Sequence, residues 1–243
     1  MKRPLFCLAI ALTPLLAHAD CETNFQKWMQ QLHPGQKLDT VHAGCKAWPA
    51  NPTRTIAVLP MPHADANDKA GALDLEVLVA DTKSGAVIAH TFEPSAIRYD
   101  AVRFGALDID TTPWPLAPGN PAFGVGVEHE YPPMAAPKAE VSMSLYVVDS
   151  QRLRKVLDRL QLDYAHGRYD AMGMGFYVDT QRTIEFGPTG EGGYAALKIK
   201  EKSVRTEHKD LSDHADEQTT YRNYTIDYRD GAYRVPKNLA SLY

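Results

Sequence analysis

The sequence predicts a mainly β protein: an antiparallel, sandwich-like sheet with a short N-terminal helix and at most one further helix. Three observations support this fold class. Short runs that are β-branched, or that alternate apolar and polar residues, recur along the chain, as in strands with one buried face. Turn-forming Gly, Pro, Asp and Asn residues separate these runs. Helical spacing of apolar residues is confined to residues 22–32 and 152–162.

The N-terminal helix is predicted over residues 22–32, because its apolar residues recur at helical spacing. These residues are Phe25, Trp28, Met29 and Leu32. The His-Pro-Gly sequence at 33–35 ends the helix, since proline and glycine both disfavour its continuation. The second helix, over residues 152–162, has leucines and a valine on one helical face, although its last residues fit a strand equally well.

Strands are predicted through the rest of the chain. A hairpin over residues 73–92 is indicated by the alternation of its first strand and by Asp-Thr-Lys-Ser-Gly at its turn. Asp-Gly at 230–231 predicts a second hairpin over residues 224–235. The other predicted strands are residues 55–59, 97–109, 122–129, 141–148, 183–186, 194–204 and 220–228. Loops are predicted for the proline-rich residues 112–121 and 131–137 and for the charged residues 205–218.

The first 19 residues have the pattern of a secretory signal peptide. A positive start, Met-Lys-Arg, is followed by an apolar run over residues 5–16 and by Ala-His-Ala at 17–19. A transmembrane helix needs roughly 20 apolar residues, so this run is too short for an anchor. We therefore expect cleavage after Ala19 and a periplasmic location for the mature chain.

The mature chain, residues 20–243, has the length of a single mostly β domain and an acidic charge balance. Loss of Lys2 and Arg3 leaves 24 basic against 30 acidic residues, a net charge near −6. Nucleic acids and anionic membranes both select basic surfaces. We therefore expect no nucleic-acid partner and no membrane span, but a soluble protein whose partner is a protein or another envelope component.

Two cysteines, Cys21 and Cys45, remain after the predicted leader with Cys7 is removed. An even pair in an oxidising compartment predicts a disulfide, here one that closes a loop of about 25 residues and contributes roughly 3 kcal/mol of stability. A metal or redox site would need a C-x-x-C motif or a third thiol, and the mature sequence has neither. Lipid attachment at Cys21 would need a small residue directly before it, where Asp20 stands.

Two groups of polar residues are candidates for chemistry. Asp108 and Asp110 alternate around Ile109, so both project from one face of a strand. Paired carboxylates can act as general acid and base, and the same spacing also arises on any strand with one wet face. His208 and His214 lie in an acidic stretch and could ligate Zn²⁺, Cu²⁺ or Ni²⁺. Their spacing matches no known ligand pattern, and a solvated loop has the same composition.

Trp114 is the candidate for a binding surface. It lies between Pro113 and Pro115 in the predicted loop 112–121, where an exposed indole would be held rigidly and would lose little entropy on binding. The alternative is an ordinary half-buried aromatic residue of a strand.

Nucleophile and metalloprotease motifs are missing from the sequence: it has no G-x-S-x-G, S-x-x-K or H-E-x-x-H. No cofactor is expected. These observations favour a binding or interaction protein without catalytic activity. The alternative is a small envelope hydrolase with an unrecognised carboxylate or metal site.

Residues 105–127 contain Leu-Asp-Ile-Asp-Thr-Thr at 107–112 and Phe-Gly-Val at 123–125. This segment, with residues 45–49 and 73–80, resembles a recurring part of uncharacterised exported proteins of Gram-negative bacteria. The resemblance implies a periplasmic protein, and it assigns no functional residue.

Overall fold

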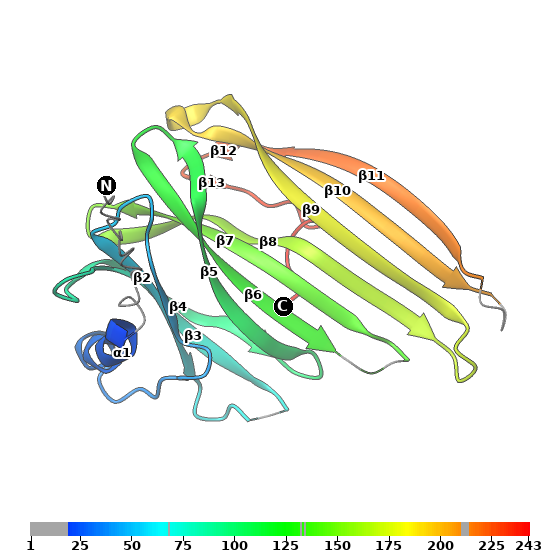
Figure 1. Ribbon diagram of the computed structural model, residues 1–243, viewed down its shortest axis with the longest axis horizontal. Coiled ribbons are helices and arrows are strands. Elements are labelled where there is room, and N and C mark those ends of the chain that lie inside the picture. Colours follow the sequence, from blue (N-terminus) through cyan, green and yellow to red (C-terminus); the bar gives the residue numbers. More distant parts are fainter. Residues whose placement is uncertain (1–18, 68, 132, 134, 210–213) are drawn as a thin grey trace, which may run out of the picture.

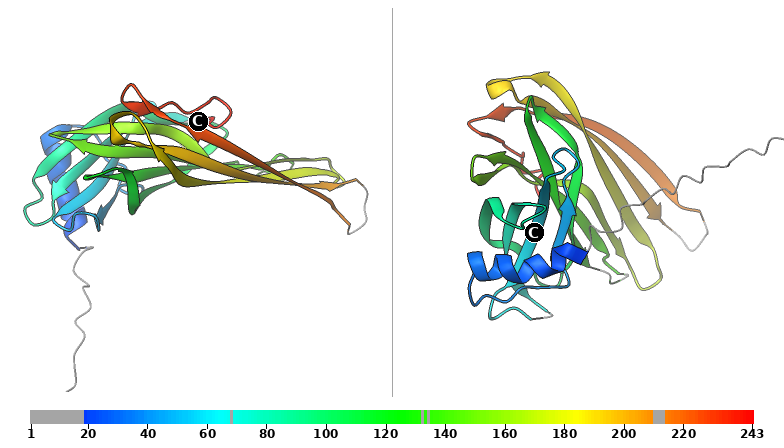
Figure 2. Two further views of the ribbon diagram at one scale, coloured as in Figure 1. Left: turned by 90° about the horizontal axis from the view of Figure 1, so that it is seen from above. Right: turned by 60° about the vertical axis from the view of Figure 1, so that its left-hand side comes forward.

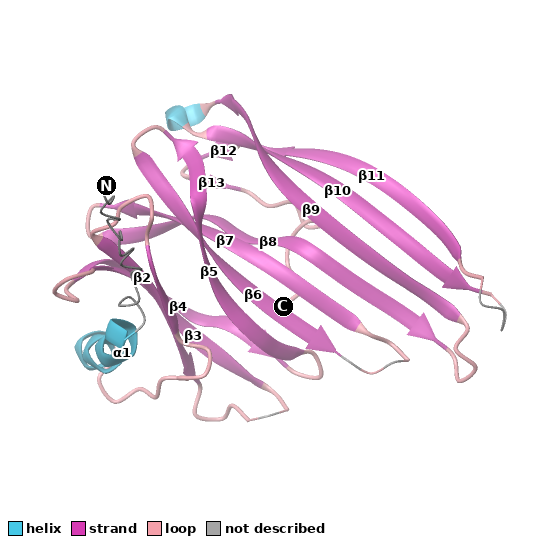
Figure 3. Cartoon of the chain, in the orientation of Figure 1, coloured by secondary structure: helices cyan, strands magenta, loops and turns pink. Residues whose placement is uncertain are grey.

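A computed structural model describes residues 19–243 except 68, 132, 134 and 210–213, and it confirms the mainly β fold (Figure 1, Figure 3). The predicted leader, residues 1–19, lies outside this description apart from Ala19. The described chain has one α-helix, α1 (Ala19–Leu32), and a 3-10 turn (Glu191–Gly193). Its strands are β1 (Gly44–Ala47), β2 (Arg54–Pro62), β3 (Gly71–Asp81), β4 (Val87–Tyr99), β5 (Arg103–Ala117), β6 (Asn120–Tyr131), β7 (Lys138–Asp149), β8 (Arg152–Tyr169), β9 (Gly175–Thr189), β10 (Ala195–His208), β11 (Asp216–Ile226), β12 (Tyr228–Arg229) and β13 (Ala232–Tyr233).

All thirteen strands are hydrogen-bonded into one open sheet. Its first part follows the order β1-β2-β3-β4-β8-β7-β6-β5, and β9, β10 and β11 continue it from the second half of β8. Most neighbours are antiparallel, but β4 and β13 each meet β8 in parallel at one position. The strands β1, β5 and β11 and the two-residue strand β12 each have one partner and form the edges of the sheet.

Three apolar clusters hold the sheet in layers. The central cluster joins β2, β3 and β4 to β5–β8, so these two parts of the sheet pack against each other as expected for a sandwich-like arrangement. The helix α1 covers the other side of β2 and β3 through Phe25, Trp28 and Met29 (Figure 2). A third cluster joins β6, β7 and β8 to the start of β10 and to the C-terminal segment.

The ends of β8–β11 project beyond these clusters as a flat extension that we call the blade, residues 163–187, 198–209 and 214–224 (Figure 1, Figure 2). The first eight residues of β11 are all exposed. A polar pair is buried at the root of the blade, where the Nε atom of Arg182 lies 2.8 Å from Glu201 Oε2. The blade thus has little apolar core of its own.

The prediction of a second helix over residues 152–162 is wrong, because this segment is the start of β8. Its apolar residues are buried on both sides of the strand: Leu153 contacts the central cluster, whereas Val156, Leu157 and Leu160 contact the third. An irregularity in the pairing with β7 lies between Leu157 and Leu160. A strand that is buried on both faces and contains a bulge therefore has apolar residues at the same spacing as one face of a helix.

Three other boundaries also differ from the sequence prediction. Residues 112–121 are the end of β5, the start of β6 and a turn at Gly119, rather than a loop. Pro113 and Pro115 are tolerated because β5 is an edge strand. Residues 97–109 are split between β4 and β5 by a turn, and residues 205–208 and 216–218 of the predicted loop belong to β10 and β11. Within the described residues, no helix is both long and apolar enough to cross a membrane.

Trp28 should be the main anchor of α1. It is 1% exposed, and its indole N–H donates to the carbonyl of Gly85 at 2.8 Å. We expect Trp28→Ala to lower the free energy of unfolding by about 3–5 kcal/mol through the loss of contacts and the resulting cavity. Lys27→Ala, at the exposed neighbour, is the matched control and should cost less than about 1 kcal/mol. Urea unfolding followed by circular dichroism measures both, and equal losses would contradict this role of Trp28.

Candidate functional site

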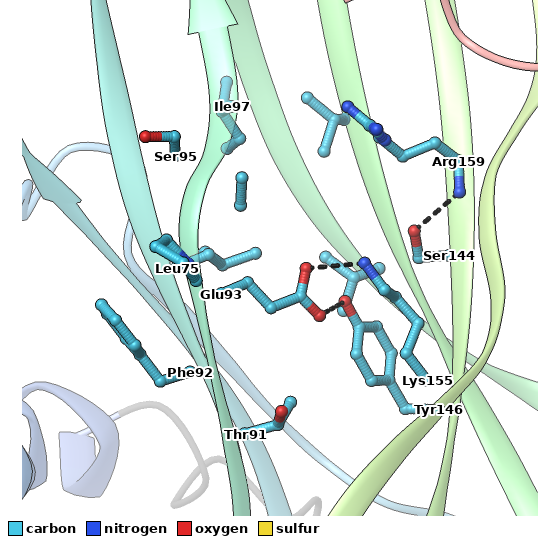
Figure 4. Close-up of a pocket in the computed structure, with 14 residues that line it drawn as sticks. Leu75, Thr91, Phe92, Glu93, Ser95, Ile97, Ser144, Tyr146, Lys155 and Arg159 are labelled. Atoms are coloured by element: carbon cyan, nitrogen blue, oxygen red, sulfur yellow. Dashed lines mark hydrogen bonds and ion pairs between the residues drawn. The ribbon is translucent and has the colours of Figure 1, made fainter.

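A cleft of about 380 Å³ opens where β4 and β8 separate (Figure 4). These two strands pair only at His90 and Arg152 and then diverge. The lining residues come from β3, β4, β6, β7 and β8. They are Leu75, Thr91, Phe92, Glu93, Pro94, Ser95, Ala96, Ile97, Val125, Val127, Ser144, Tyr146, Lys155 and Arg159.

One wall of the cleft is a bulge in β4. Leu75 pairs with Glu93 and Leu73 pairs with Ile97, so three residues of β4 lie opposite the single residue Asp74. Proline at position 94 cannot donate to the ladder, which favours the irregularity. The carboxylate of Asp74 accepts the backbone N–H of the bulged residue 95 at 2.7 Å. The bulge is therefore held in place by a side chain of the neighbouring strand.

A second bulge lies in β8, on the other wall. Leu157 pairs with Leu145 and Leu160 pairs with Met143, which leaves one extra residue in β8. The backbone N–H of Arg159 donates to the hydroxyl of Ser144 on β7 at 3.0 Å. Here too, a side chain of the neighbouring strand satisfies the N–H group that the bulge removes from regular pairing.

Both bulges place a non-glycine residue in the left-handed backbone region. Ser95 has φ +48° and Arg159 has φ +45°. The only other such residues in the described chain, Ser150 and Asp230, lie in tight turns between strands. A left-handed non-glycine residue costs about 1–2 kcal/mol, and such strain concentrates at binding and catalytic sites. The two strained strand positions meet at this one cleft.

A partly buried carboxylate, Glu93, contacts two donors on the floor of the cleft (Figure 4). Glu93 accepts the phenolic O–H of Tyr146 at 2.8 Å and lies 2.9 Å from the Lys155 ammonium. The same ammonium lies 2.7 Å from Asp158. The single positive charge of the lysine therefore lies between two carboxylates, and Tyr146 is almost wholly buried.

The environment keeps both donors protonated. Burial raises the pKa of Tyr146 well above its ordinary value, and the charge of Glu93 raises it further. Burial lowers the pKa of Lys155, but attraction to Glu93 and hydrogen bonds to Asp158 and Glu93 outweigh this effect, so that the net pKa is raised. A tyrosine or lysine that serves as base or nucleophile near neutral pH needs a lowered pKa. These two groups instead act as fixed donors.

A second depression of about 590 Å³ continues the cleft and shares Ser95 and Arg159 with it. It adds Arg98, Tyr99, Asp100 and the C-terminal residues 241–243. We call the cleft and this depression together the groove. The Nη1 atom of Arg159 donates to the main-chain oxygen of Tyr243, the last residue of the sequence, at 3.2 Å, and its Nε atom lies 3.7 Å from Asp158.

The two aspartates predicted from the sequence do not form a joint site. Asp108 lies 2.6 Å from the ammonium of Lys46 and is largely exposed. Asp110 accepts the indole N–H of Trp114 at 3.0 Å and the backbone N–H of Thr112 at 2.8 Å. Neither aspartate lines the groove.

Trp114 lies on β5 and not in a loop, which corrects its predicted setting. Its indole is half-buried and meets Phe186 edge-on, with ring centroids 6.1 Å apart. It lines a separate hollow of about 550 Å³ with the prolines around it. The structure thus joins Trp114 to Asp110 but places both away from the groove.

The predicted histidine pair lies at the tip of the blade. His208 ends β10 and His214 precedes β11, and residues 210–213 between them lie outside the description. Among the described residues, no group of three His, Cys, Asp or Glu side chains is positioned to hold a metal ion. A metal site at these two histidines stays a prediction.

The predicted disulfide has one described side chain. Cys45 lies on β1 and packs against the cluster that α1 forms with β2 and β3. Cys21 lies in α1, one turn before Phe25, and its side chain is outside the description. The pairing of Cys21 with Cys45 stays a prediction.

Sequence reasoning missed the residues of the groove. The one local signal is Pro94, which lies between the predicted strands that end at residue 92 and begin at residue 97, where the structure has one bulged strand. Lys155 and Arg159 were assigned to a helix, so their side chains could not be placed opposite β4. The chain matches no protein-family model, no curated protein and no solved structure.

The Tyr146–Glu93 contact should make stability depend on alkaline pH. A group whose pKa is higher in the folded state stabilises the fold below its unfolded pKa, and this contribution is lost as pH rises. The raised pKa values of Tyr146 and Lys155 act in the same direction. We therefore expect the free energy of unfolding to fall above about pH 10.

The Tyr146→Phe variant tests this contact. It should lower stability by about 1–2 kcal/mol at neutral pH, because Glu93 loses a buried donor, and it should make the alkaline loss of stability shallower. Tyr221→Phe, at a tyrosine that is 73% exposed, is the control. Denaturant unfolding across pH measures both, and an unchanged alkaline slope in Tyr146→Phe would exclude the assigned interaction.

Proposed function

We propose that the chain is a periplasmic binding protein without catalytic activity, whose ligand occupies the groove between β4 and β8. The two facing bulges carry this proposal. Each keeps a strained residue, Ser95 or Arg159, at the rim of one cleft, and each is anchored by a side chain of the adjacent strand. Bulges of this kind re-aim side chains next to functional sites.

The lining of the groove favours a small ligand with an acidic group and an apolar body. Leu75, Ile97 and Val125 provide apolar surface in the cleft. Arg98 and Arg159 bring two positive charges to the connected depression, against the one acidic side chain of its lining, Asp100. Arginine matches the planar geometry of carboxylates, and a few polar groups in an apolar pocket fix the orientation of a ligand.

The alternative of an envelope hydrolase finds less support. Its catalytic residues would have to include a group that gives up or accepts a proton near neutral pH. Two polar groups that line the cleft, Tyr146 and Lys155, have raised pKa values. They are suited to hold Glu93 and to shape the cleft.

Export is the second part of the proposal, and it rests on the leader pattern of residues 1–19 and on the pair Cys21 and Cys45. Intact-mass measurement of the protein from its native host should give the mass of residues 20–243 less two hydrogens. Neither cysteine should react with an alkylating reagent until the protein is unfolded and reduced. A retained leader, or two reactive thiols, would contradict export with a disulfide.

Ligand binding can be tested with octanoate as the probe, and octanol and octylamine as uncharged and cationic comparisons. We expect octanoate to bind most tightly in calorimetry. The Arg159→Gly variant should weaken octanoate binding about tenfold, since it removes a cation near the acid group. Its stability should stay within about 1 kcal/mol of the wild type, because glycine adopts a positive φ without strain.

The matched control is Arg234→Gly, at an exposed arginine whose partner Asp230 lies in the β12–β13 turn. It should bind octanoate like the wild type. Equal binding of the three probes, or octanoate binding that Arg159→Gly leaves unchanged, would count against an acid-binding groove.

A further inference from the structure

The free edge of β11 is the longest unprotected edge of the sheet. It runs from Asp216 to Ile226 along the outer margin of the blade (Figure 1). Its eleven pairs with β10 show no register shift, and it contains no proline. Its first eight side chains are exposed, including the 73% exposed Tyr221. A long regular edge presents a row of backbone donors and acceptors that can pair with another strand.

The edge strands β1 and β5 differ from β11 because they have features that block pairing with another chain. The edge strand β1 has four residues. The edge strand β5 contains Pro113 and Pro115, and its register with β6 is interrupted three times. Short length, proline and bulges are the usual protection of an edge strand against other chains. β11 has none of these three features, which indicates that its edge pairs with another strand.

We propose that β11 pairs antiparallel with β11 of a second copy of this chain, around a two-fold axis at Thr219. In an antiparallel pair, hydrogen-bonded and non-hydrogen-bonded positions alternate. Two residues that face each other across a two-fold axis must both be at hydrogen-bonded positions or both at non-hydrogen-bonded positions. Neighbouring residues differ in this respect, so at the axis a residue must lie opposite the same residue of the second copy. This restricts self-pairing to registers centred on a residue.

The charges of β11 select the register centred on Thr219. It places Asp216 of one copy directly opposite Arg222 of the other, and the symmetry forms this pair twice. Registers centred on the adjacent positions 218 or 220 bring no aspartate or glutamate opposite an arginine. Opposite charges that face each other across strands stabilise the pairing, and like charges destabilise it.

The proposed contact also continues a charge pattern already present in the blade. Arg182, Glu201 and Arg222 follow one another on neighbouring strands, with contacts of 2.8 Å and 3.4 Å. An aspartate from the second copy would be the next member of this alternating row. On the other face, Tyr221 would cover Glu217 of the second copy, and the two Thr219 side chains would lie side by side.

Sedimentation analysis of the full mature chain over a wide concentration range tests the pairing. Wild-type protein should form a dimer. Arg222→Asp and Asp216→Arg should each weaken it about tenfold or more, because each places like charges opposite each other twice. The double variant D216R/R222D restores opposite charges and should recover the dimer. Arg229→Asp, at an arginine of β12 that is similarly exposed, is the control and should leave dimerisation unchanged.

A cross-linking experiment tests the register without altering a charge. Under mild oxidation, Thr219→Cys should form a disulfide between two copies, because directly opposite residues have Cβ atoms close enough for a bridge. Thr225→Cys, an exposed threonine on the same face of β11, has no counterpart nearby in this register and should stay unlinked. A monomer at every concentration, a double variant that stays as weak as the single ones, or equal linking at both positions would overturn the proposal.

Discussion

The rest of the structure depends on how β8 pairs: one of its edges pairs with a single strand, and the other edge pairs with several segments in turn. One edge of this 18-residue strand pairs with β7 almost throughout. The other edge meets β4 at Arg152, β13 at Leu157 and the C-terminal segment at Leu160, and it pairs with β9 from Asp163 onward. No single neighbour could follow this edge, because the bulge between Leu157 and Leu160 changes its direction. The groove and the blade both result from this change of partners.

At the groove, backbone irregularity and side-chain chemistry depend on each other. The bulges of β4 and β8 keep the strands apart, and the contact of Glu93 with Tyr146 and Lys155 closes the floor between them. A buried carboxylate without such donors would be costly. The raised pKa values of the two donors therefore reflect burial combined with the carboxylates beside them, and both donors stay protonated against Glu93 at neutral pH.

At the root of the blade, a chain of polar contacts replaces an apolar core. Arg182 donates to Glu201 and to the side-chain amide oxygen of Gln161, and the amide N–H of Gln161 donates to Glu140, each at 2.8 Å. The Glu140 carboxylate also accepts from Ser241 and from the backbone N–H of Leu242. Buried polar groups that satisfy one another fix a single geometry. The C-terminal segment thereby ties the blade to the packed region, and the blade can present its edge although most of its surface is exposed.

The sequence by itself determined the elements that depend on local pattern. The helix around Trp28, the hairpin at residues 73–92 and the Asp-Gly turn at 230–231 follow from apolar spacing and turn chemistry, and the mainly β class follows from their sum. Local pattern failed at residues 152–162, because a strand that is buried on both sides loses the alternation that identifies strands.

Which residues line the groove became clear only from the tertiary structure. Glu93, Tyr146 and Lys155 lie on three strands, and their contact depends on how β4 approaches β7 and β8. The backbone strain at Ser95 and Arg159 is likewise imposed by Asp74 and Ser144 on neighbouring strands. Sequence spacing encodes periodicity along one element. It does not encode which elements contact one another, and the groove is formed where several different strands come together.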